Sequence, residues 1–85
     1  MTKHPEKILT LNDIPVREPG AARYVPSFNA TGSWDVVMYP SAGQSSVIDS
    51  KPNFQSAVRS CMRWQKRENT SVAAENKRRE KNVAA

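Results

Sequence analysis

The strongest chemical signal in this chain is a group of four cations in its last third. They stand at the spacing i, i+4, i+7 and i+8: Arg59, Arg63, Lys66 and Arg67. On a helix, this spacing brings all four side chains to one face over about 12 Å of its length. Such a row can contact successive phosphate groups, and arginine can also read base edges in a DNA groove. An ordinary solvated helix face has the same pattern, so both interpretations stay open.

Further candidates for partner binding are a second basic run and two aromatic residues. The basic run is Lys77, Arg78, Arg79 and Lys81. It extends the positive charge, although Glu75 and Glu80 dilute it. Trp64 stands at the border between the apolar and basic sides of the predicted helix, and Tyr39 stands on a predicted strand. Either ring can stack on a base or anchor a partner protein, and either can equally complete the core.

The net charge of +5 is distributed unevenly along the chain. Residues 1–58 carry five cations and five anions, whereas residues 59–85 carry eight cations and three anions. The whole excess therefore lies in the last third. This asymmetry predicts an anionic partner, either a nucleic acid (DNA or RNA) or nucleoprotein complex, or an acidic protein surface, or a membrane surface.

Residues suited to catalysis or metal binding are sparse. His4 is the only histidine and Cys61 the only cysteine, so neither a His/Cys metal cluster nor a disulfide framework can form within the chain. Asp35 and Asp49 stand on predicted neighbouring strands, where paired carboxylates can do acid–base work. No histidine accompanies them, and solvent-facing positions explain them better. We therefore expect a protein that is not an enzyme and uses no cofactor, metal or small-molecule substrate.

A long amphipathic helix must position the cations. No Pro or Gly follows Pro52. At about 100° per residue, one half of the helix receives Phe54, Ala57, Val58, Cys61, Met62, Trp64 and Gln65. The four cations fall on the opposite side, which predicts a helix from about residue 54 to at least residue 68, with Ser50 or Asn53 as its N-cap. Residues 73–85 fit either a basic helical extension or a disordered tail.

The strands are predicted from alternation of apolar and polar residues. Residues 33–39 alternate clearly, residues 40–43 form a turn, and residues 44–49 read as the returning strand of a hairpin. Residues 7–11 are a candidate third strand, whereas residues 17–32 read as loop.

The predicted fold class is therefore α+β. A β-hairpin, or a three-stranded antiparallel sheet if residues 7–11 join it, packs on one long C-terminal helix. One small domain is expected over residues 8–72, after a flexible N-terminal lead at residues 1–7. The expected core consists of Trp34, Val36, Met38, Val47 or Ile48, Phe54, Val58, Cys61 and Met62.

Three functional hypotheses follow. The first is a non-catalytic protein whose basic helix contacts nucleic acid or a nucleoprotein complex; in shape alone, the order strand–strand–helix resembles small DNA-binding modules such as integrase arm-type domains. The second is a protein that binds and inhibits or redirects a larger host protein, since short chains without motifs resemble accessory proteins of phages and mobile elements in general style. The third, a membrane-surface helix, is disfavoured because the core needs the apolar face.

The expected location is the cytoplasm. The N-terminus lacks the features of a signal peptide, and no apolar run reaches the roughly 20 residues of a membrane span. We therefore expect a soluble protein with no transmembrane segment.

Overall fold

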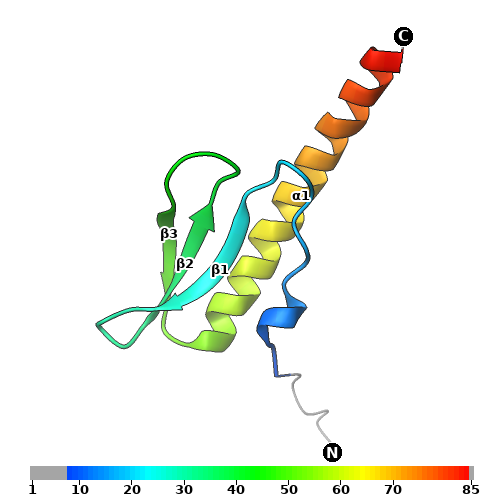
Figure 1. The fold of residues 1–85 in the computed structure, drawn as a ribbon. Coiled ribbons are helices and arrows are strands. Elements are labelled where there is room, and N and C mark those ends of the chain that lie inside the picture. The colour runs from blue at the N-terminus through cyan, green and yellow to red at the C-terminus, as the bar shows by residue number, and fades with distance from the viewer. Residues whose placement is uncertain (1–7, 85) are drawn as a thin grey trace, which may run out of the picture.

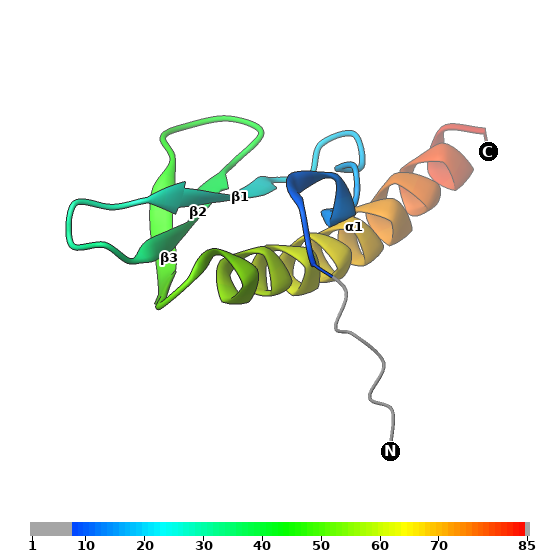
Figure 2. The same ribbon diagram turned by 90° about the horizontal axis from the view of Figure 1, so that it is seen from below.

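A three-stranded antiparallel sheet lies on one long C-terminal helix (Figures 1 and 2). The computed structural model describes the fold of residues 8–84 and the side chains of residues 8–79, and the predicted lead, residues 1–7, lies outside the described residues. In chain order the elements are the 3-10 turn η1 (Leu11–Asp13), β1 (Arg23–Phe28), β2 (Trp34–Tyr39), β3 (Ser46–Lys51) and α1 (Phe54–Ala84). The sheet order is β1-β2-β3. The predicted α+β class is confirmed.

The predicted hairpin is β2 with β3. β3 begins two residues later than the predicted strand, and the pairing contains one irregularity. Val36 pairs with Asp49 and Val37 pairs with Val47, so Ile48 is the extra residue of a bulge. The bulge lets Ile48 pack on the core beside Val36, which is fully buried.

The third strand is β1 and not residues 7–11, and the loop predicted at residues 17–32 was wrong in its middle part. Pro26 concealed the strand, because proline cannot donate to a ladder of hydrogen bonds. β1 is an edge strand that pairs only with β2. The Tyr24 N–H bonds to a helix side chain on the side away from β2. Because alternate residues of a strand face the same way, the Pro26 nitrogen also points away from β2. The sheet therefore loses no hydrogen bond through the N–H that proline lacks.

The core lies between the sheet and α1. Its centre is Ala22, Tyr24, Val36 and Cys61, and partly buried Ile14, Met38, Ile48 and Trp64 pack against it. At one end of the sheet, Trp34 meets Phe54 edge to face at 4.9 Å between ring centroids. Of the expected core, Val36, Val58 and Cys61 are fully buried, whereas Trp34, Met38, Phe54 and Met62 are only half-buried.

The most enclosed polar side chain is Gln65, at 1% exposed, and it joins α1 to β1. Its Nε2 donates to the Ala22 carbonyl at 2.8 Å, and its Oε1 accepts from the Tyr24 N–H at 3.0 Å. One amide thus satisfies two outward-facing backbone groups at the start of the edge strand, which otherwise would need water or another chain.

Other polar side chains of α1 hold residues 8–22, which we call the N-terminal strap. Figures 1 and 2 show the strap beyond the free edge of β1, on the same side of α1 as the sheet. Four further helix residues bond its backbone: Gln55 to Leu9, Glu68 to Ala22, Asn69 to Val16 and Glu18, and Asn76 to Pro19. Pro19 and Gly20 form a turn within the strap, in which the Ala21 N–H donates to the Glu18 carbonyl and Gly20 has a φ of 88°.

We expect Gln65→Leu to lower the free energy of unfolding by about 2–4 kcal/mol, because it leaves a buried donor and a buried acceptor unpaired. Chemical denaturation followed by circular dichroism measures this. Gln55→Leu is the matched control, since it also removes two bonds to backbone, but at a half-buried position where water can replace them. A Gln65 variant no less stable than the Gln55 variant would contradict the role given to Gln65.

Candidate functional site

The four predicted cations form one exposed surface on α1, the basic helix face (Arg59, Arg63, Lys66 and Arg67). It points away from the sheet because Val58, Cys61 and Gln65 point into it. Among the side chains that the structure describes, none of these four has a carboxylate partner within ion-pair distance. Four uncompensated charges on a single helix repel one another, and an external anion relieves that repulsion.

The second basic run does not continue this face as a unit. At about 100° per residue, Lys77 lies at the angle of Arg59 and Arg78 lies about 20° from Arg67, whereas Arg79 turns away from the basic helix face. Arg78 also pairs with Glu75 at 3.7 Å. The side chain of Lys81 lies outside the described residues. Of this run, the structure therefore brings Lys77 and Arg78 to the side of the basic helix face.

The two candidate aromatic residues lie on different sides of the molecule. Trp64 is half-buried and stacks on Tyr24 at 5.9 Å between ring centroids, with the Arg67 guanidinium 5.9 Å from the centre of its ring. Tyr39 is 46% exposed and lies on the face of the sheet opposite α1. There it lines a groove of about 440 Å³ together with Arg17 and Arg23.

Sequence reasoning missed a fifth cation beside the basic helix face, Lys51 at the end of β3. A groove of about 300 Å³ separates the end of β3 from the first turns of α1, and we call it the β3–α1 groove. Its lining residues are Lys51, Pro52, Ser56, Arg59, Ser60 and Arg63. The spacing between Lys51 and the start of the predicted helix was the available signal, since only Pro52 and Asn53 separate β3 from α1.

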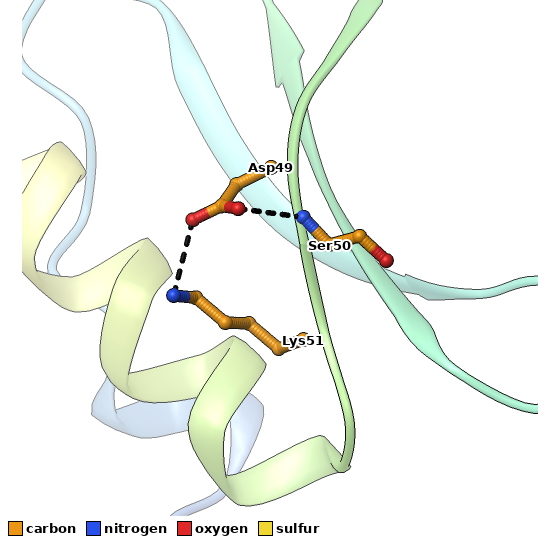
Figure 3. Close-up of polar contacts among 3 residues, drawn as sticks. All are labelled: Asp49, Ser50 and Lys51. Carbon is orange, nitrogen blue, oxygen red and sulfur yellow. Dashed lines mark hydrogen bonds and ion pairs between the residues drawn. The ribbon is translucent and has the colours of Figure 1, made fainter.

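Asp49 holds Lys51 in place (Figure 3). The Lys51 ammonium lies 3.2 Å from one carboxylate oxygen of Asp49, and the Ser50 N–H donates to the other at 2.8 Å. The Ser50 hydrogen bond, followed by that of Lys51, holds the pKa of Asp49 below its usual range. Asp49 is therefore ionised at neutral pH and offsets part of the charge of Lys51.

The structure separates the two carboxylates that the sequence placed on neighbouring strands. Asp35 pairs with Ser50 and Asp49 with Val36, so the two acids occupy successive register positions and lie on opposite faces of the sheet. Asp35 accepts a hydrogen bond from the Asn29 side chain at 2.9 Å. Within residues 8–79, no group of three His, Cys, Asp or Glu side chains could hold a metal ion.

Comparisons of the chain with protein-family models, curated proteins and solved structures give no match. Over the described part of the chain, no helix has the length and apolarity needed to cross a bilayer. The surface contains five cations from two elements, Lys51 at the end of β3 and the four residues of the basic helix face on α1.

Cys61 is fully buried beneath the sheet, and burial raises the pKa of its thiol to about 11. Because only the thiolate is a nucleophile, we expect native protein at pH 8 to react with a disulfide reagent about 100-fold more slowly than unfolded protein, whose cysteine has a pKa of about 8.5. Stopped-flow absorbance with and without urea measures the ratio. Equal rates would show that the thiol is accessible in the fold.

Proposed function

We propose that this protein binds nucleic acid, alone or within a nucleoprotein complex, through phosphate contacts made by the basic helix face. The observation that carries the proposal is the exposure of four cations without carboxylate partners among the described residues. Phosphate contacts by Lys and Arg supply most of the affinity of non-specific nucleic-acid binding. The protein acts as a binding module and not as an enzyme, and its location is the cytoplasm.

The spacing of the cations supports this partner. Arg59 to Arg67 spans about 12 Å of helix axis. A DNA duplex carries one charge per about 1.7 Å of its own axis, so a phosphate lies within reach of every side chain in the row. The bonds of Gln65 and the strap fix the rotation of α1, and the cations are therefore held outward before a partner arrives.

The surroundings of the basic helix face favour a nucleic acid over an acidic protein. Tight protein interfaces depend on buried aromatic anchors. The one aromatic residue at this border, Trp64, already packs on Tyr24 and beneath Arg67. Other exposed neighbours, Thr70 and Ala74, are small. Binding here therefore depends on charge, which suits a polyanion.

A second candidate function uses the other face of the sheet. Tyr39 is 46% exposed and Val47 is 58% exposed, and both lie on the side that α1 does not cover. Exposed aromatic and aliphatic side chains on one sheet face suit a protein partner. This observation favours an accessory protein that binds and inhibits or redirects a larger protein.

We expect the protein to bind mixed-sequence duplex DNA with an affinity that falls about 100-fold between 50 and 200 mM salt, as roughly four phosphate contacts require. The double variant Arg63→Glu/Lys66→Glu should lose this binding. Fluorescence anisotropy with duplex DNA, single-stranded DNA and RNA measures both effects and ranks the three nucleic acids by affinity.

The matched control is Arg17→Glu/Arg23→Glu, which also lowers the net charge from +5 to +1 but on the strap and the far side of the sheet. It should retain most of the binding. Equal losses in both double variants would mean that total charge decides the affinity, not the basic helix face. If the protein binds none of the three at 50 mM salt, the proposal is wrong, and Tyr39→Ala in pull-downs then tests the second candidate.

A further inference from the structure

The β3–α1 groove differs from the rest of the basic surface because two elements enclose it. Lys51 reaches it from β3, whereas Arg59 and Arg63 reach it from α1. Its volume of about 300 Å³ equals that of about ten liquid water molecules, which accommodates a phosphate group with some water. Lys66 and Arg67, by contrast, do not line the groove.

A nearly buried hydroxyl in this groove has no partner. Ser60 is 7% exposed and lines the groove, and its side chain makes no hydrogen bond to any residue that the structure describes. No fully enclosed polar side-chain atom in the described part lacks a partner. The Ser60 hydroxyl therefore reaches the surface through the groove. Because no described protein group is hydrogen-bonded to it, this hydroxyl is available to a ligand oxygen.

The local electrostatics favour an anion. Asp49 offsets Lys51, but Arg59 and Arg63 add two charges without carboxylate partners among the described side chains. The groove also lies at the start of α1, whose first turn contains no acidic residue.

The donors match a tetrahedral oxyanion. Lysine offers three N–H donors, arginine offers a planar fork, and serine offers a hydroxyl. Lys51 comes from the end of β3, and Arg59, Arg63 and Ser60 come from α1. A phosphate has oxygens enough to accept hydrogen bonds from donors on both elements.

We infer that the β3–α1 groove is a phosphate seat that holds one backbone phosphate of a bound nucleic-acid strand. The inference rests on the proposed function and deepens it, because it names the point at which the strand is anchored. Lys51 and Ser60, which lie outside the basic helix face, become partner-contacting residues. Free phosphate shares the chemistry and serves as the probe.

The test is an NMR titration of the ¹⁵N-labelled full chain with inorganic phosphate. Sodium phosphate replaces sodium chloride step by step, so that the ionic strength stays constant. We expect saturable shifts in the amides of residues 51–63 and none beyond residue 70. Lys51→Met should lower the affinity for phosphate about 10-fold, because it removes a charge-assisted hydrogen bond. Ser60→Ala should lower this affinity about threefold. Asp49→Asn should raise it, because it removes the carboxylate that offsets the charge of Lys51. Arg17→Met is the control, since it removes an exposed cation elsewhere.

A second arm uses a short single-stranded DNA. Lys51→Met should reduce the slope of log affinity against log salt by about 0.7, the loss of one phosphate contact on a single strand, whereas Arg17→Met should leave it unchanged.

The outcomes separate the seat from the proposed function. Shifts spread evenly along α1, and equal in all variants, would overturn the seat; DNA binding with a steep salt slope would then leave the proposed function standing. Localised phosphate binding without DNA binding would overturn both the proposed function and the nucleic-acid source. Localised phosphate binding with an unchanged DNA slope in Lys51→Met would overturn the anchoring role alone.

Discussion

The fold depends on one buried amide. Gln65 is the point where a helix and an edge strand 41 residues earlier in the chain exchange both a donor and an acceptor. Such an exchange fixes the rotation and the height of α1 against β1, because a shift of one residue would leave two backbone groups unpaired at a buried position. Apolar packing alone tolerates small rotations far better, since it has no direction. The remaining contacts of α1 follow from the orientation that Gln65 sets.

That orientation also decides which part of α1 meets solvent. With Gln65 pointing at the sheet, Arg63 lies about 160° away and Lys66 about 100° away around the helix. One side of α1 therefore contacts the core and the strap backbone, and the four cations of the basic helix face project from the other side. Asn69 and Asn76 extend the occupied side beyond the sheet by holding the strap. The basic surface is therefore a consequence of the internal bonding and not an independent feature of the helix.

Periodicity predicted the elements that are regular. The alternation at residues 33–39 predicted β2, and the spacing of apolar residues after Phe54 predicted α1 with Asn53 as a possible cap, which the bond from the Ser56 N–H confirms. β1 was missed because its alternation is interrupted by Pro26, which only an edge position permits. The strap contacts were missed for another reason. Gln65 and Asn69 follow helical spacing, but their partners are backbone atoms. Nearly every residue has the same backbone groups, so the sequence does not indicate which of them a side chain will bond.

The β3–α1 groove shows how a short connection creates a surface that charge counting along the chain does not predict. Lys51 belongs to the electrically balanced first part of the sequence, yet it joins cations of the last third. Only Pro52 and Asn53 connect β3 to α1. Proline restricts the turn, and the Asn53 side chain bonds the Ser56 N–H at 2.8 Å, so the helix begins at once. The first two turns of α1 must therefore lie beside the end of β3. A longer loop would let Lys51 and Arg59 separate, and the same residues would form a scattered positive surface without an enclosed groove.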